Sequence, residues 1–256
     1  MEITEIIISL IGGFCAGILN ALAGFGSIIT LAIYMDVLGI PGNLANATNR
    51  VNILASSSIS AFTFYKNGKL DTSKGGWIII VTILGAIAGV LLAVNLDADG
   101  FKKAFKYFLI PIFLILLLNP KRFILADINS LPTSKWIMAP IFFLFGIYAG
   151  FIQVGFGVLF LLVIVIMAKY DLIKGNALKI TIVALYTVIV LAIFHSRGMV
   201  NWNVGLTLAV GQGLGGYVAA RNASRLEGAN KWAYRFLVVI VGAVIIHNFE
   251  LYKLLT

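Results

Sequence analysis

Residues 13–26 of this chain read GFCAGILNALAGFG, and residues 146–157 read GIYAGFIQVGFG. Both stretches begin with a Gly-x-x-x-Gly pair, continue to an amide side chain, Asn20 or Gln153, and end in Gly-Phe-Gly. Farther along, an offset of 130 residues matches Asn46 with Asn176, and the alanine that follows each of them also matches. This self-similarity indicates two related halves.

The composition is typical of an integral membrane protein. Hydrophobic residues make up 61% of the 256 residues and charged residues 11%, against about 25% charged in an average soluble domain. Runs such as 77–94 and 180–194 show little polar alternation, which favours membrane-spanning helices. The net charge of +9 comes from basic residues between the apolar runs, where they orient a membrane protein. We therefore exclude nucleic acid as a partner.

The sequence lacks the residue patterns of enzymes and metal sites. It contains no phosphate-binding P-loop, no zinc-type histidine pair and no nucleophile–base pair. Cys15 is the only cysteine, which excludes a disulfide framework and a thiolate metal cluster. We therefore predict no catalytic residues, no metal and no cofactor.

The apolar runs predict an all-α membrane protein with about five hydrophobic segments in each half. The first repeat is expected at 1–120, a connecting loop at 121–135 and the second repeat at 136–256. The expected segments are 6–22, 26–38, 46–64, 77–94 and 103–118, then 137–154, 158–168, 176–195, 204–220 and 234–249.

The second segment of each half is too short to cross a membrane by itself. At 1.5 Å per residue it reaches about 15–20 Å, against about 30 Å of hydrocarbon. Each short segment follows a Gly-Phe-Gly motif, and glycine permits unusual backbone angles. We predict non-helical backbone at the motifs and a bent or re-entrant pair of segments in each half. Two tilted full spans are the alternative. The glycines expected at the breaks are Gly24, Gly26, Gly155 and Gly157.

The charge distribution predicts the orientation. With the N-terminus outside, 13 lysines and arginines fall in inside loops and 6, among them Arg50, fall outside. This asymmetry favours both termini outside. An odd number of segments per half then makes the two repeats inverted relative to each other, an arrangement found in many secondary transporters, with a site at the repeat interface.

The third segment of each half carries the polar residues from which we build a candidate site. Asn49 and Arg50 lie near the start of one, and Lys179 aligns with Asn49 in the other. A helix N-terminus with a cation in its first turns suits an anion. The alternative is that Arg50 and Lys179 extend to lipid head groups. Ser56 and Ser60, on the same helical face, are expected to hold helices together.

Asn20 and Gln153 lie just before the glycine breaks, inside otherwise apolar segments. Buried amides need hydrogen-bond partners. They would either bind substrate or cap carbonyl groups freed by the break, and the residues alone favour neither. Gly85 with Gly89, and Gly211 with Gly215, have the spacing of close helix packing.

The stretches 13–20, 23–27, 38–41 and 45–49 together resemble the sulfite exporter TauE/SafE family, and the second half repeats the pattern. The resemblance covers most of the chain. It implies a multi-pass transporter in the bacterial inner (cytoplasmic) membrane that moves sulfite, sulfonates or related organic anions.

The expected function is a secondary transporter of a small sulfur-containing or carboxylated anion, working by alternating access. The expected partners are that anion, membrane lipid and a coupling proton or ion, and an oligomer is compatible with the sequence. The substrate-binding candidates are Asn20, Asn49, Arg50, Gln153 and Lys179. A metal-ion transporter and a passive anion channel are the alternatives.

Overall fold

The computed structural model describes residues 2–22, 24–73, 75–117 and 132–222. These residues form helices and connecting turns and no strand, so the protein is an all-α integral membrane protein. The predicted segment 234–249 and residues 121–131 of the predicted loop lie outside the described residues. The elements are α1 (Ile3–Leu22), α2 (Gly26–Ala32), η1 (Ile33–Val37), α3 (Gly42–Lys66), α4 (Gly76–Ala93), α5 (Ala98–Leu117), α7 (Lys135–Phe151), α8 (Phe156–Met167), α9 (Leu172–Ser196) and α10 (Trp202–Asn222).

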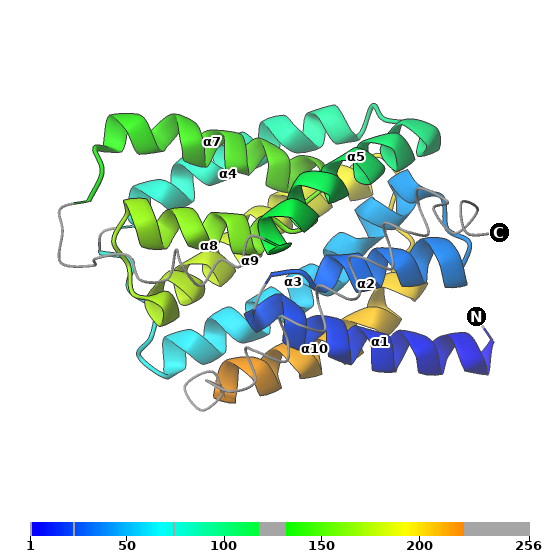
Figure 1. The fold of residues 1–256 in the computed structure, drawn as a ribbon. Coiled ribbons are helices and arrows are strands. Elements are labelled where there is room, and N and C mark those ends of the chain that lie inside the picture. The colour runs from blue at the N-terminus through cyan, green and yellow to red at the C-terminus, as the bar shows by residue number, and fades with distance from the viewer. Residues whose placement is uncertain (1, 23, 74, 118–131, 223–256) are drawn as a thin grey trace.

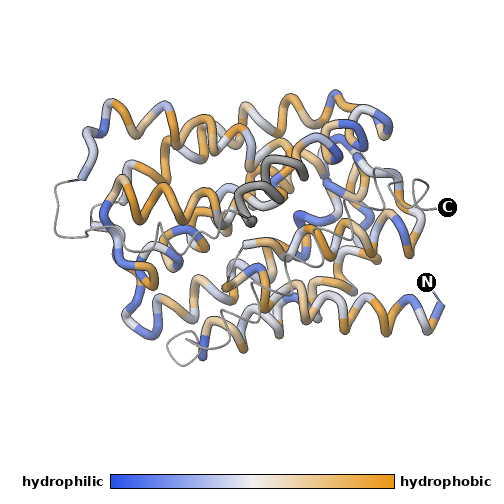
Figure 2. Tube along the Cα trace, in the orientation of Figure 1, coloured by the Kyte–Doolittle hydropathy of each residue, from blue (hydrophilic) through white to orange (hydrophobic). Residues whose placement is uncertain are grey.

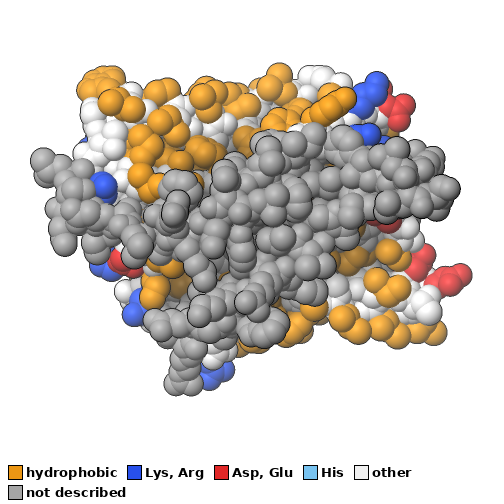
Figure 3. Space-filling view, in the orientation of Figure 1, with side chains coloured by type: hydrophobic (Ala, Val, Ile, Leu, Met, Phe, Trp, Pro, Cys, Tyr) orange, Lys and Arg blue, Asp and Glu red, His pale blue; other side chains and the backbone are white. Residues whose placement is uncertain are grey.

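The sides of the helix bundle are apolar. Within the described residues, α1, α4 and α9 are long and apolar enough to cross a membrane, judged by length and composition. The hydrophilic residues gather mainly toward the left and right ends of the molecule in Figure 2, with hydrophobic stretches between them. The space-filling view in Figure 3 shows the same division on one face, where charged side chains lie toward the two ends and hydrophobic side chains lie above and below the part drawn in grey.

Helices α1 and α2 form a hairpin around Gly24. Helix α1 ends at Leu22, and Gly24 has a φ of 77°, which glycine adopts without strain. The chain then returns along α1. Two contacts show this: a Cβ at Gly26 would meet the carbonyl oxygen of Ala16, and one at Gly12 would meet the side chain of Ile33. The return arm ends in the π-helix η1.

Helices α7 and α8 form the corresponding hairpin in the second half. Its turn contains two residues in the left-handed region, Gln153 with φ 62° and Gly155 with φ 70°. Aromatic side chains hold the two arms together antiparallel. The rings of Phe142 and Phe160 lie 5.2 Å apart, and those of Phe145 and Phe156, nearer the turn, lie 6.3 Å apart. Each predicted short segment is thus the return arm of a hairpin.

The turns of the two hairpins meet inside the molecule. Gly24 and Gly157 touch backbone to backbone, so a Cβ on either would overlap the Cα of the other. Figure 1 shows the two hairpins opening toward opposite ends, α1–α2 toward the right of the view and α7–α8 toward the left. Re-entry from a membrane face and the inverted orientation of the two repeats stay predictions.

The outer helices pair across the two halves. Helix α1 packs along α10, and α7 packs along α4, while α3 lies between α10 and α9 (Figure 1). Small residues permit the close backbone approach: Gly211 and Gly215 face the backbone of α1, and Gly85 and Gly89 face that of α7. The spacing of these glycines predicted this packing.

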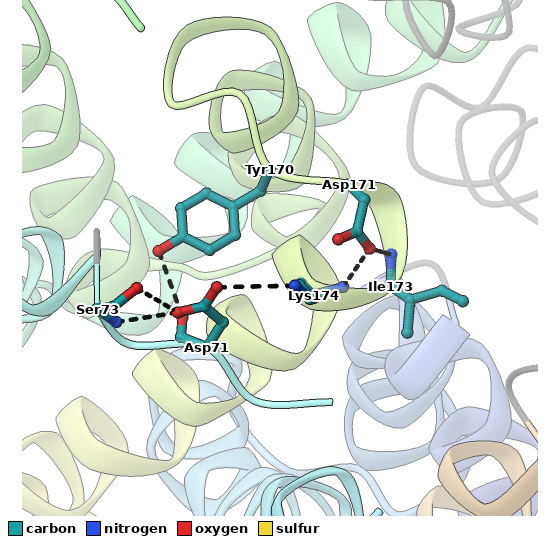
Figure 4. Close-up of polar contacts among 6 residues, drawn as sticks. All are labelled: Asp71, Ser73, Tyr170, Asp171, Ile173 and Lys174. Carbon is teal, nitrogen blue, oxygen red and sulfur yellow. Dashed lines mark hydrogen bonds and ion pairs between the residues drawn. The ribbon is translucent and has the colours of Figure 1, made fainter. Parts of the chain in front are cut away.

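Two groups of loops define the ends of the bundle. At one end, the loop after α3 contacts the start of α9 (Figure 4): Lys174 Nζ lies 3.8 Å from Asp71 Oδ2, and the Tyr170 hydroxyl donates to the Asp71 carbonyl at 3.3 Å. At the other end, Asn43 donates to the carbonyl of Leu96 at 3.4 Å, and the Asn201 amide donates to Thr48 Oγ1 at 3.0 Å. The loops predicted on one membrane face thus lie together, and the sidedness itself stays a prediction.

Candidate substrate site

A small cavity lies beside the contact between the hairpin turns. Its volume of ≈ 10 Å³ is about the space that one water molecule needs. Both turns contribute to its wall, through Gly24 from the first and Gln153 from the second. The polar residues that line it are Asn20 of α1, Ser56, Ser57 and Ser60 of α3, Gln153 and Lys179 of α9.

Lys179 is the basic residue of this wall. Its side chain is 1% exposed, and its Nζ has no hydrogen-bond partner among the described residues. Such an amine is costly to bury when it is protonated, because a buried charge needs a counter-charge or hydrogen bonds. The Nζ of Lys179 is therefore able to bind a group that enters the cavity, since no described residue accepts a hydrogen bond from it.

Arg50 is buried as completely as Lys179 but is fully engaged at its terminal nitrogens. Its side chain is 0% exposed. Nη1 donates to the carbonyl of Ala149 at 2.8 Å and to Gln153 Oε1, and Nη2 donates to the carbonyl of Gly150 at 3.2 Å. These carbonyls belong to the last turn of α7, where the helix dipole is negative. Arg50 thus caps α7.

The expectation that both cations sit at helix starts is wrong. Helix α3 begins at Gly42, directly after Pro41, and α9 begins at Leu172, where the Asp171 carboxylate accepts from two backbone amides. Arg50 and Lys179 therefore lie about two turns inside their helices, beyond the free N–H groups of the first turn. Their burial also excludes head-group contact and corrects the assignment of Arg50 to an outside loop.

Gln153 connects Arg50 to the cavity. Its backbone is left-handed, its Oε1 accepts from Arg50, and the residue lines the cavity wall. Asn20, the corresponding amide of the first half, lines the same wall. The structure thus brings Asn20, Gln153 and Lys179 together at the cavity and places Arg50 one contact away.

Asn49 lies in a separate buried network. Its Oδ1 accepts from Thr30 at 2.6 Å and from Asn52 at 3.0 Å. Tyr34 donates to Asn52 at 2.7 Å, and Asn52 also donates to Gln212 Oε1. The network joins the return arm of the first hairpin to α3 and α10. It leaves Asn49 outside the cavity wall, away from the other predicted site residues.

The predicted glycines divide between turn and helix. Gly24 and Gly155 have left-handed backbones in the two turns, whereas Gly26 begins α2 and Gly157 lies in the first turn of α8. The second glycine of each motif provides space instead. The backbone of α1 packs against Gly26, where a side chain would not fit. Gly24 packs in the same way against Gly157, which also lines the cavity.

Sequence reasoning missed several residues of the site. Ser56 and Ser60 face Gly216 of α10, as expected for contacts between helices, and both also line the cavity with Ser57. Their spacing on one face of α3 was the available signal. Gln212, which belongs to the network of Asn49 and not to the cavity wall, has no sequence signal beyond being an amide in an apolar segment.

Comparison with known proteins places the chain in a family. A model of the sulfite exporter TauE/SafE family matches residues 9–248, and the chain belongs to that family. It is therefore a membrane transporter and not an enzyme. A search of solved structures found no match.

Several curated relatives carry similar names. A protein of Sinorhizobium sp, "Probable membrane transporter protein ORF9", is 28% identical over 83% of this chain and 81% of its own length. A Haemophilus influenzae "Probable membrane transporter protein" is 26% identical over 82% of this chain and 81% of its own. In Escherichia coli K12, "Probable membrane transporter protein YfcA" is 28% identical over 90% of this chain and 83% of its own.

Proposed function

We propose that this chain is a secondary transporter that moves a small anion across the bacterial cytoplasmic membrane by alternating access. The anion is sulfite, a sulfonate or a related carboxylate, and it binds at the cavity around Lys179. The observation that carries this proposal is the buried Lys179 amine, which has no hydrogen-bond partner among the described residues and stands in a polar wall between the two hairpin turns.

The unpartnered nitrogen at the cavity favours an anion over a metal cation. Among the described residues, four buried side-chain nitrogens have hydrogens without an acceptor, and one buried amide oxygen, Asn176 Oδ1, lacks a donor. A dehydrated anion needs fixed donors to replace its water shell. Of these four nitrogens, Lys179 Nζ is the one that lines the cavity, and a donor there suits an anion and opposes a metal cation. The four nitrogens are Asn49 Nδ2, Arg50 Nε, Lys179 Nζ and Gln212 Nε2.

The two halves support the alternating-access part of the proposal. The cavity wall combines both hairpin turns with α3 and α9, the longest described helices. Rocking of one half against the other would open the contact between Gly24 and Gly157 toward one membrane face at a time. At ≈ 10 Å³ the cavity is smaller than any organic anion, so binding requires such an opening.

Ligand-dependent thermal stability tests the proposal. Purified full-length protein in detergent would be heated with sulfite, isethionate or acetate, and with tetramethylammonium as a cation control. A bound ligand at a hundred times its dissociation constant stabilises the folded state by about 2.7 kcal/mol, so the correct anion raises the melting temperature. No shift with any of the three anions would contradict the proposal.

Transport assays then separate a transporter from a passive channel. In proteoliposomes, uptake of the stabilising anion is expected to saturate with its concentration and to follow an imposed gradient of a coupling ion. Flux that rises linearly with concentration would favour the channel.

A further inference from the structure

We propose that Lys179 carries the coupling proton. Its side chain is a neutral amine when no anion is bound, and it takes up one proton as the anion enters, so that anion and proton cross together. This inference rests on the proposed anion site and adds the identity of the coupling ion. The juxtaposition that carries it is a fully buried amine, without a hydrogen-bond partner among the described residues, in the wall of the cavity between the hairpin turns.

The two buried cations differ in what compensates their charge. Arg50 keeps its proton under all physiological conditions, and the carbonyls of Ala149 and Gly150 accept from its guanidinium at 2.8 and 3.2 Å. Lys179 has no such acceptor within the described chain. An ammonium group there would remain a buried charge without compensation, which is the state that proteins avoid by losing the proton. Arg50 is thus a fixed charge and Lys179 a switchable one.

Among the described residues of the helices around Lys179, the other buried charged side chain is Arg50, which is positive. Arg50 comes from α3 and contacts Gln153 in the cavity wall. Buried or half-buried tyrosine hydroxyls also lie on these elements: Tyr186 on α9 itself, Tyr148 of α7, which donates to the Val154 carbonyl, and Tyr34 of η1, which donates to Asn52. Helices α4 and α8 contain no ionisable residue.

The remaining described charges on these elements lie toward the helix ends. Lys174 and His195 of α9, Lys135 of α7, Lys66 of α3 and Arg221 of α10 are exposed, and Cys15 of α1 is exposed as well. Every described carboxylate is exposed or half-buried at a helix end or in a loop, so none offers Lys179 a permanent counter-charge. These carboxylates are Glu2, Glu5, Asp36, Asp71, Asp97, Asp99 and Asp171.

An entering anion changes this balance. Its negative charge is the missing partner of an ammonium group, so the lone pair of Lys179 Nζ takes a proton from water on the side to which the cavity is open. The resulting ammonium pairs with the anion through charge-assisted hydrogen bonds. When the site opens to the other side and the anion leaves, the ammonium loses its partner and returns the proton to water there. A monovalent sulfonate therefore crosses with one proton and no net charge.

Proton uptake on binding is measurable directly. Binding of isethionate to the purified full-length protein would be followed by titration calorimetry in buffers of different ionisation heat, at a series of pH values. Isethionate stays ionised throughout, so any proton taken up belongs to the protein. We expect uptake to approach about one proton per anion as the pH rises, with affinity falling about tenfold per pH unit in that range.

Two lysine variants locate the proton. Lys179→Arg keeps a permanent charge and should bind isethionate with no proton uptake. Lys135→Arg, an exposed control at the start of α7, should behave as the unmodified protein does. If Lys179→Arg does not yield folded protein, the proton uptake per bound isethionate, measured over the pH series in the unmodified protein, tests the proposal.

The outcomes separate the two proposals. Binding of isethionate without proton uptake at any pH, or proton uptake that persists in Lys179→Arg, overturns the assignment of Lys179 and leaves the anion site standing. Failure of isethionate, sulfite and acetate all to bind overturns the anion site, and the proton role with it.

Discussion

Gly24 and Gly157 meet backbone to backbone where the turn of one hairpin reaches the return arm of the other. The two residues come from matching motifs in the two halves of the sequence. Their contact leaves no space for a side chain on either residue, and Gly24 also needs its positive φ of 77°. The cavity wall includes both of them. The rocking of the two halves proposed above would separate this pair.

Gly24→Ala should stop transport and destabilise the protein. The left-handed backbone costs an alanine about 1–2 kcal/mol, and its methyl group would also overlap Gly157. Gly198→Ala is the matched control, because Gly198 has a similar φ of 67° but no atom within 4 Å of an added Cβ. Thermal unfolding and uptake into proteoliposomes measure the two effects. If Gly24→Ala and Gly198→Ala had the same thermal stability and the same uptake, the contact between Gly24 and Gly157 would have no role in either property.

Two asparagines cap the hairpins of the opposite halves. Asn46 of α3 donates to the carbonyl of Phe151 at 2.9 Å, and Asn176 of α9 donates to the carbonyl of Ala21 at 3.0 Å. Asn46→Ala and Asn176→Ala each leave a carbonyl at a hairpin turn without this partner. Each should lower the free energy of unfolding by about 1–3 kcal/mol, measured by denaturant titration. The exposed Asn203→Ala should change it little, and a Asn46→Ala variant as stable as that control would contradict the capping role.

Arg50→Ala should damage folding more than binding. The substitution removes the donors to Ala149, Gly150 and Gln153 and leaves their oxygens buried without a partner, at a cost of at least about 2 kcal/mol. Arg50→Lys should rescue only part of this loss, because a single ammonium cannot reproduce the planar fork. The yield of folded protein in size-exclusion chromatography is the measurement, with the exposed Arg197→Ala as control. Normal yield of Arg50→Ala would show that the cap is dispensable.

The orientation is testable by cysteine labelling. After replacement of Cys15, a cysteine at exposed Ser73 should react with an impermeant reagent only once cells are opened, and one at exposed Lys102 should react in intact cells. The physical basis is the excess of basic residues at the end that holds Ser73. The reverse pattern would invert the orientation, and labelling of both in intact cells would place both ends on one side.

Much of the fold could be predicted because its signals are local. The glycine motifs repeat in the sequence, and a segment too short to cross a membrane can be recognised from its length. Helix starts were harder. The sequence predicts a loop at Gly42 to Ala45 and at Leu172 to Gly175, because a weakly apolar first turn resembles a connection. The signals for a helix start were Pro41 and Asp171, which stand directly before these helices. That error placed Arg50 and Lys179 at helix N-termini.

The sequence predicts which kinds of side chain form the candidate site better than it predicts which of them lie together. Buried amides and cations in apolar segments attract attention individually, and the structure gathers Asn20, Gln153 and Lys179 at one cavity. It separates Asn49, whose partner Thr30 lies on the return arm of a hairpin. It also adds Gln212 from α10 to the network of Asn49. Both outcomes depend on packing between distant segments, which one sequence does not reveal.

Anion binding at the amine of Lys179 is tested most directly by calorimetric titration of isethionate and sulfite into the unmodified protein and into Lys179→Met. Methionine keeps most of the side-chain length without the amine, and loss of an unpartnered buried amine should leave the folded state as stable as before or more so. We expect the variant to fold normally and to lose at least about tenfold in affinity, equivalent to about 1.4 kcal/mol, while the exposed Lys135→Met binds as the unmodified protein does. Unchanged affinity in a well-folded Lys179→Met would contradict the account and place the anion elsewhere.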